Sequence, residues 1–213
     1  MKDYSVRICF LLLLCVLLIG CAKQETPPPP KYEPEEKVIT DVRKYFPADD
    51  QLTWEYEGFG NEYATFTRKV LHRQGNRVQI SENNGGTVMG LVFDVSADAV
   101  TKTFSIPEHY DDRNILNEKA NLNEIVLKTP LKVGGNWQNE GSKREVVGID
   151  ETVEVPAGRF ERVVKIKITP LDHKQDHLQY EYYAENTGLI LREFIAGDQK
   201  ITSKLKSFEK LSK

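Results

Sequence analysis

Two histidines four residues apart, His173 and His177, form the pattern in this sequence that comes nearest to a metal site. Imidazoles at this spacing share one face of a helix, an arrangement that zinc sites use. However, no glutamate follows the first histidine, Pro170 precedes the pair and an alternating segment follows it, so a hairpin loop is expected here. The two histidines are therefore only weak candidates for metal ligands, and nothing in the sequence calls for a cofactor.

Patterns that support catalysis are missing from the sequence. It contains no Gly-x-Ser-x-Gly elbow, no glycine-rich phosphate loop and no dinucleotide fingerprint. Adjacent acidic residues such as Asp49-Asp50 and Asp111-Asp112 fall in expected turns, where acidic residues are common for conformational reasons. We therefore expect a protein that is not an enzyme.

Aromatic residues are the stronger lead to a binding site. The candidates are Trp54, Tyr56, Trp137, Tyr180 and Tyr182. Aromatic residues in strands usually pack in the core. In a strongly curved sheet the same side chains would instead line an apolar cleft that holds a lipid tail. The sequence leaves both interpretations open.

The most specific residue for chemistry is Cys21. An unbroken apolar run from 8 to 19 has the length of a signal-peptide core and is too short for a membrane-spanning helix. The four residues Leu18-Ile19-Gly20-Cys21 resemble the bacterial lipobox, in which the cysteine is joined to diacylglycerol and becomes the first residue of the mature protein. The other two cysteines, Cys9 and Cys15, lie within the signal, so the mature chain is expected to have no disulfide.

The segments that follow indicate a tethered domain. Residues 1–20 are the expected signal peptide, and 21–36 the lipidated cysteine with a proline-rich tether that includes four consecutive prolines. Residues 37–213 are expected to form a single β-rich domain. Over the 213 residues, 29 Lys and Arg face 32 Asp and Glu, a net charge of −3, which argues against nucleic acid as a partner.

The elements that would position these residues are mostly strands. Apolar and polar residues alternate in Leu52–Tyr56, Phe160–Ile168, Leu178–Tyr182 and Leu189–Ile195, and turn residues separate such runs at short intervals. We predict a mainly β fold, a curved antiparallel sheet or half-barrel of about ten to twelve hairpin-linked strands. The run Val88–Val95 is apolar on both faces, which predicts a central strand. One short N-terminal helix is predicted between Pro34 and Phe46.

Two features suggest how this domain is divided. Pro47, Trp54, Glu57 and Gly58 recur as Pro130, Trp137, Glu140 and Gly141, all at an offset of 83. If this offset reflects an internal repeat, the halves are 45–106 and 128–210. Between them, residues 107–124 are polar and acidic without periodicity, which is typical of a long loop that is functional, mobile or simply a linker.

Several segments of the mature domain resemble a group of uncharacterised bacterial lipoproteins. The resemblance rests on Tyr45-Phe46-Pro47 with Trp54-Glu55-Tyr56, Gly58-Phe59-Gly60-Asn61-Glu62, Pro130-Leu131-Lys132-Val133-Gly134 with Trp137, Val155-Pro156-Ala157-Gly158-Arg159-Phe160 and Tyr182-Tyr183-Ala184-Glu185-Asn186-Thr187-Gly188-Leu189-Ile190. It implies an envelope location and a curved antiparallel sheet, and it supplies neither an activity nor catalytic residues.

These observations lead to three functional hypotheses of decreasing weight. The first is a lipoprotein anchored through Cys21 on the outer side of the cell membrane, binding or scaffolding an unknown envelope protein through a sheet edge or the 107–124 loop. The second is a carrier of an apolar ligand or lipid in a cleft of the sheet. The third is an envelope hydrolase, which would need a histidine close to a hydroxyl or carboxylate group in a pocket.

Overall fold

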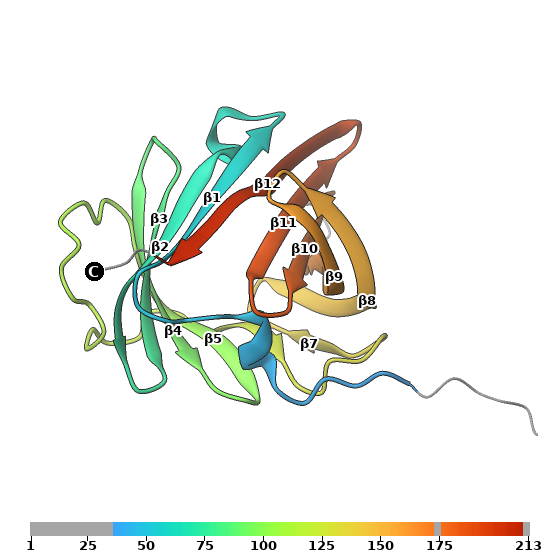
Figure 1. Ribbon diagram of the computed structural model, residues 1–213, viewed down its shortest axis with the longest axis horizontal. Coiled ribbons are helices and arrows are strands. Elements are labelled where there is room, and N and C mark those ends of the chain that lie inside the picture. The colour runs from blue at the N-terminus through green and yellow to red at the C-terminus, as the bar shows by residue number, and fades with distance from the viewer. Residues whose placement is uncertain (1–35, 173–175, 211–213) are drawn as a thin grey trace, which may run out of the picture. The chain divides into compact units, whose positions relative to one another are not determined.

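The computed structural model describes residues 36–172 and 176–210, which form one antiparallel sheet of twelve strands (Figure 1). The first six strands are β1 (Leu52–Phe59), β2 (Phe66–Gln74), β3 (Arg77–Asn83), β4 (Val88–Val95), β5 (Ala99–Ile106) and β6 (Glu124–Lys128). The other six are β7 (Asn136–Gln138), β8 (Ser142–Val155), β9 (Gly158–Pro170), β10 (Leu178–Ala184), β11 (Gly188–Ala196) and β12 (Gln199–Lys210). The prediction of a mainly β, antiparallel fold is confirmed.

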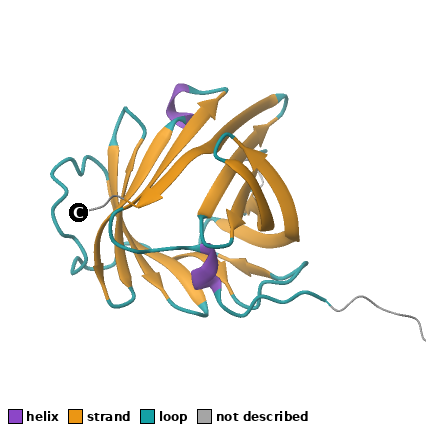
Figure 2. Cartoon of the chain, in the orientation of Figure 1, coloured by secondary structure: helices purple, strands orange, loops and turns teal. Residues whose placement is uncertain are grey.

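Helical structure within the described ranges is limited to two single 3-10 turns, η1 (Val42–Tyr45) and η2 (Glu62–Ala64) (Figure 2). None of the helical segments in this part of the chain has the length and apolar character needed to cross a bilayer. The signal peptide, Cys21 and the proline-rich tether up to residue 35 lie outside the described residues, as does His173.

The strands follow their chain order around the sheet, and the last strand, β12, pairs with β1. This order leaves β6 and β7 as the two edges, and the sheet curves until these edges come close together (Figure 1). Side chains join them: Asn139, directly after β7, accepts from the Ile125 main-chain N at 2.9 Å and donates to the Ile125 O at 3.1 Å. The Trp137 indole N–H donates to the same oxygen at 2.9 Å. We call this junction the seam; it gives a nearly closed, barrel-shaped sheet.

One end of the rolled sheet is filled by residues 39–48. Ile39 exchanges two backbone hydrogen bonds with Leu131, and the Val42 N–H donates to the Ala97 carbonyl. Lys44 accepts from the N–H of Asn186, so the segment is bound to the connections β4–β5, β6–β7 and β10–β11, which share this end. The side chains of Val42, Tyr45 and Phe46 are buried. We call this the closed end.

The helix predicted between Pro34 and Phe46 is not found in residues 36–46, the part of that range that the structure describes. Only Val42–Tyr45 form a turn, which Asp41 caps by accepting from the Arg43 N–H at 3.0 Å. The reason is competition for backbone groups: Ile39 is extended and paired with Leu131, so its N–H and C=O do not enter a helix. The β-branched residues around Ile39 also favour the extended form.

The long connection between β5 and β6, residues 107–123, is packed against the outer face of β3, β4 and β5. Ile115 and Leu116 are fully buried beside Val92. The buried side chain of Gln79 donates to the Arg113 carbonyl at 2.8 Å and accepts from the Ile115 N–H at 2.8 Å. This connection is therefore an ordered cover, and β4 is apolar on both faces because both of its faces are buried.

The spacing that suggested an internal repeat places its two tryptophans in different surroundings. The Trp54 indole on β1 donates to the Thr187 carbonyl at the closed end, whereas Trp137 on β7 donates to Ile125 at the seam. Strands β1–β5 fall within 45–106 and β7–β12 within 128–210. The repeat itself stays a prediction.

Candidate functional site

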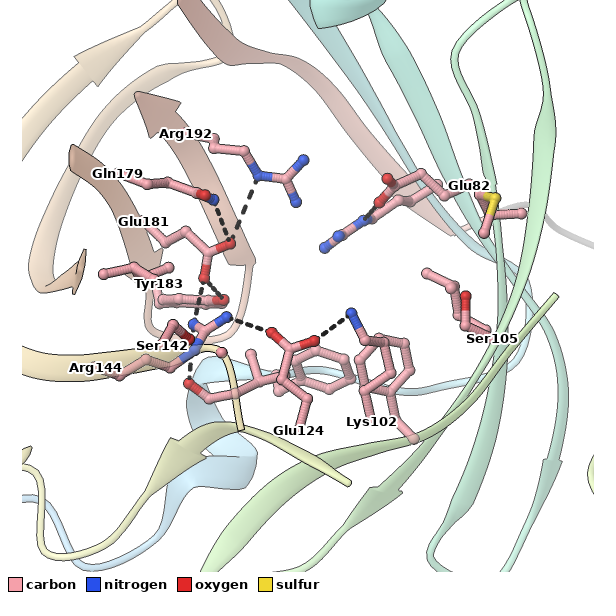
Figure 3. Close-up of a pocket in the computed structure, with 18 of the residues that line it drawn as sticks. Glu82, Lys102, Ser105, Glu124, Ser142, Arg144, Gln179, Glu181, Tyr183 and Arg192 are labelled. Atoms are coloured by element: carbon pink, nitrogen blue, oxygen red, sulfur yellow. Dashed lines mark hydrogen bonds and ion pairs between the residues drawn. The ribbon is translucent and has the colours of Figure 1, made fainter. Parts of the chain in front are cut away.

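A cavity of about 440 Å³ lies inside the sheet, toward the end opposite the filled one. Its floor includes Phe46, whose ring lies 5.0 Å from that of Phe93. Seven charged side chains are part of its lining: Arg68, Lys102, Arg144 and Arg192 with the carboxylates of Glu82, Glu124 and Glu181. Figure 3 shows all of them except Arg68 with labels. This is a polar chamber inside a sheet whose other inward positions are largely apolar.

The strands place these charges inside through their period-two alternation. On β2, Arg68 lies between the buried Phe66 and Val70, and all three side chains share the inner face. On β10, Glu181 pairs with the buried Ile166 of β9, so both side chains point inward. The charges therefore occupy positions that a core residue would otherwise fill.

An ion-pair network joins both sides of the seam within this cavity (Figure 3). The Arg144 guanidinium on β8 binds Glu181 Oε2 on β10 at 2.8 Å and Glu124 Oε1 on β6 at 2.9 Å. Lys102 on β5 binds Glu124 Oε2 at 2.6 Å, and the Tyr183 hydroxyl donates to Glu181 Oε2 at 2.7 Å. Four strands that are not all neighbours are thereby joined through side chains.

This network determines the ionisation of its members. Burial by itself would raise the pKa of Glu181, but Arg144 and Arg192 outweigh it and hold this pKa at about 2. Burial likewise opposes ionisation of Glu124, and Lys102 and Arg144 lower its pKa nonetheless. Burial and the nearby Glu181 raise the pKa of the Tyr183 hydroxyl well above its ordinary value. Glu124 and Glu181 are therefore ionised at neutral pH, and each is paired with two cationic side chains.

A second cluster surrounds Phe66 on β2. The Arg68 Nε lies 2.6 Å from Glu82 Oε2, and burial of Glu82 is outweighed by Arg68 and Arg192, which lower its pKa. The guanidinium carbons of Arg68 and Arg192 lie 5.7 and 5.2 Å from the centre of the Phe66 ring. Tyr56 stacks on Phe66 with 4.2 Å between the ring centres. The aromatic ring thus supports both guanidinium groups.

Arg192 differs from Arg68 and Arg144, because those two donate hydrogen bonds to cavity carboxylates and Arg192 donates none to a described residue. Its Nε, like that of Arg144, is buried without a hydrogen-bond acceptor, and Glu181 Oε1 lies 3.6 Å from it. None of its N–H groups donates a hydrogen bond to another described residue within ordinary hydrogen-bond geometry. Since the side chain is 27% exposed, its donors are accessible from the cavity.

An outer cavity of about 400 Å³ shares Glu82 and Arg192 with the inner one. Its lining includes Tyr63, Phe194 and Ile201 with the polar side chains of Asn61 and Asn84. Arg192 therefore lines both the polar inner cavity and the more aromatic outer one.

The five aromatic candidates lie apart from the inner cavity. Trp54 and Tyr56 line a void of only about 20 Å³, and both side chains are buried. Trp137 is buried at the seam. Tyr180 and Tyr182 occupy the face of β10 opposite Glu181, with Lys165 Nζ 4.7 and 5.1 Å from their ring centres. Of these five, Tyr56 is connected to the charged clusters through Phe66, on which it stacks.

Of the two histidines, only His177 lies among the described residues. His177 lines the inner cavity and its ring lies 4.8 Å from that of Phe194. Among residues 36–172 and 176–210, no group of three or more His, Cys, Asp or Glu side chains is arranged to hold a metal ion.

Two of the charged residues of the cavity have a recognisable position in the sequence, in phase with apolar residues of the same strand. Arg68 and Arg144 each lie two positions from a buried valine on the same strand, Val70 and Val146. A charge in phase with core residues of a strand indicates an inward-facing charge. Without knowledge of the pairing, the sequence does not show that seven such charges meet.

Comparison with known proteins shows similarity at the level of fold. No family model matches the chain, and no curated protein matches it significantly in sequence. A Bacteroides fragilis protein, provisionally described as exported and as having a YmcC-like fold, superimposes with a TM-score of 0.51 at 16% identity, over 78% of this chain and 99% of that one. A Parabacteroides distasonis protein, provisionally described as a lipoprotein, gives a TM-score of 0.46 at 15% identity, over 78% and 98% of the two chains. The chain therefore shares the fold of the Bacteroides protein.

Proposed function

We propose that this protein is an extracytoplasmic binding module that holds a small molecule in the cavity inside its sheet. The observation that carries this proposal is the 440 Å³ chamber lined by four cations and three carboxylates. Charged groups are costly to bury, and a chain that needed only a stable core would fill these positions with apolar residues. Convergent polar groups in a preformed cavity are typical of ligand sites.

The location rests on the first residues of the chain. The apolar run up to Ile19 and the lipobox-like residues that end at Cys21 support export and lipid anchoring at the membrane. The provisional description of the Bacteroides protein as exported agrees with this location.

We propose binding without catalysis. The pKa of each cavity carboxylate is lowered by neighbouring cations, so at neutral pH none of them holds a proton to donate as a general acid. These acids are arranged to hold the arginine and lysine side chains in place.

The test uses the mature chain, residues 21–213, with Cys21→Ala so that no lipid is attached. It is incubated with an envelope extract of its own host and analysed by native mass spectrometry. We expect one ligand per chain. Ser142→Trp, which places a large side chain in the cavity, should abolish the adduct, whereas Ser207→Trp, where the serine binds Glu55 away from the cavity lining, should retain it. No adduct, or one that both variants retain, would contradict the proposal.

A protein partner is the second candidate, and the exposed aromatics near the outer cavity favour it. Phe59, at the end of β1, is 50% exposed, and Tyr63, within η2, is 56% exposed. Exposed aromatics of this kind often anchor protein interfaces. The two sheet edges favour it less, because side chains of the seam already satisfy the backbone of Ile125.

A further inference from the structure

The ligand's chemistry can be read from Arg192, an inference that rests on the proposed function. Its guanidinium has five N–H donors; the buried Nε has no hydrogen-bond acceptor among the described residues, and its ion-pair partner, Glu181 Oε1, lies 3.6 Å away. Buried donors without acceptors are rare in folded proteins and are usually satisfied by water or a ligand. Arg192 therefore lacks a planar acceptor group that could take two parallel hydrogen bonds from its guanidinium.

Arg68 provides a second set of donors beside it. Its Nε is used by Glu82 at 2.6 Å, and its other N–H groups donate to no described residue. Phe66 lies within 6 Å of both guanidinium carbons, so it orients the two groups through its π face without using their N–H donors. The carboxylates nearby are committed: Glu82 to Arg68, and Glu181 to Arg144 and Tyr183.

The charges in the inner cavity do not balance. Four cations face three carboxylates among its described lining residues, which leaves one positive charge, and the geometry assigns it to Arg192. An oxyanion would supply both the missing charge and the missing acceptors, because carboxylates and phosphates bind guanidinium groups with two parallel hydrogen bonds.

The outer cavity determines the rest of the ligand. It begins at Arg192 and continues along Phe66, Phe194 and Ile201. A molecule bound by its oxyanion at Arg192 would place its remaining part against these apolar side chains.

We propose that Arg192, supported by Arg68, binds the oxyanion of an amphiphile, a carboxylate or a phosphate, whose apolar part lies in the outer cavity against Phe194 and Ile201. The apolar part buries hydrocarbon surface, and the oxyanion satisfies donors that the protein leaves open.

Three probes test this assignment on the mature chain that carries Cys21→Ala: decanoate, decyl phosphate and decanol. Titration calorimetry is expected to show one site for at least one of the two anions. Decanol, which has the same chain and no charge, should bind about tenfold more weakly or worse. A preference between decanoate and decyl phosphate identifies the kind of head group, and equal binding of decanol would overturn the assignment.

Variants locate the site. Arg192→Met should weaken the bound anion by about tenfold or more, and Arg192→Lys should restore part of the affinity because it keeps the charge and loses the fork. Arg159→Met removes an arginine that pairs with Glu154 and Glu161 on the β8–β9 hairpin and should leave the affinity unchanged. Ile201→Ser, which removes apolar surface without adding charge, should weaken decanoate or decyl phosphate while leaving inorganic phosphate binding unaffected.

The outcomes separate this proposal from the binding function. If the host-derived adduct forms and persists in both Arg192 variants, the oxyanion assignment is wrong and the cavity still binds a ligand. If neither the extract nor any probe gives an adduct, both proposals fail. A circular dichroism spectrum and melting curve of each variant show that it is folded when its binding is measured.

Discussion

Arg144 on β8 and Glu124 on β6 lie on opposite sides of the seam, with Arg144 Nη2 2.9 Å from Glu124 Oε1. The same guanidinium binds Glu181 at 2.8 Å. A single arginine therefore contributes to closing the sheet, beside Asn139 and Trp137, and holds two carboxylates of the inner cavity. Stability of the fold and the electrostatics of the site depend on the same side chain.

Arg144→Met should lower the free energy of unfolding by about 3–5 kcal/mol, because Glu124 and Glu181 lose a cation to which both are bound in the interior. Urea denaturation measures the change. Arg159→Met is the control: its side chain is 62% exposed and its carboxylate partners are 3.7 and 3.9 Å away, so a loss below about 0.5 kcal/mol is expected. An equal loss of unfolding free energy in both variants would show that the buried ion-pair network stabilises the fold no more than an exposed ion pair does.

Stability should fall in acid as Glu181 takes up a proton. Its folded-state pKa of about 2 lies below the ordinary value of 4.5, so the unfolded chain binds this proton first as the pH falls. The stabilisation is complete above about pH 5 and is lost progressively as the pH falls toward 2, and it is on the order of 3 kcal/mol. Glu181→Gln should be less stable at neutral pH and should lose less on acidification. Parallel curves for the variant and the parent chain would rule out Glu181 as the group responsible.

Asn139→Ala should loosen the seam. Both hydrogen bonds to the Ile125 main chain are lost, which costs about 1–3 kcal/mol if the backbone groups find no other partner. Hydrogen exchange at the Ile125 amide should accelerate more than exchange within β3. Asn136→Ala removes a neighbouring exposed asparagine, which donates only to the Gly134 carbonyl, and should leave exchange at Ile125 unchanged.

Gly90→Ala should displace the 107–123 cover. A Cβ at position 90 would lie 2.8 Å from His109 Cγ and 2.9 Å from Ile115 Cδ1, closer than packed carbon atoms approach. We expect a destabilisation of about 1–3 kcal/mol and faster proteolysis within residues 107–123. Gly141→Ala, where the added Cβ meets no atom within 4 Å, is the matched control. Unchanged proteolysis in Gly90→Ala would show that the cover does not depend on this contact.

Cys21→Ala should release the full-length protein from membranes or leave its precursor unprocessed, because the thiol is the proposed attachment point of the lipid. Cell fractionation followed by mass measurement of the N-terminus distinguishes the two results. Mature protein that stays fully bound to membranes in the variant would contradict lipid anchoring at this residue.

The sequence predicted the strands well because alternation is a local signal. The run Val88–Val95 was expected to be a central strand, and it is β4, covered on its outer face by Ile115 and Leu116. The identity of that cover was not predictable, since two apolar residues in a polar segment give no periodicity. The predicted N-terminal helix was wrong because Ile39 pairs with Leu131, which is far away in the sequence.

The site was harder to predict than the fold. On β10, alternation of Leu178, Tyr180 and Tyr182 drew attention to one face, whereas the cavity is lined by Gln179, Glu181 and Tyr183 from the other. The sequence does not distinguish a buried charge from a surface charge, because only the pairing of the strands shows which face of each strand is enclosed. Seven charges on seven strands converge only through this pairing.

The closed end also determines which contacts carry a mechanical force that is applied to the N-terminal side of the domain. A pull on the chain ahead of Glu36 first reaches two ion pairs, Glu36–Lys132 at 3.8 Å and Lys37–Asp150 at 2.7 Å. It next reaches the two hydrogen bonds between Ile39 and Leu131. It then reaches the bond from Val42 to Ala97, so the tension is shared between β8 and two strand connections. None of these contacts involves Arg192 or the outer cavity. For a chain anchored through Cys21, as we propose, tension from the anchor would act first on the contacts of the closed end. The outer cavity around Arg192 would keep its shape.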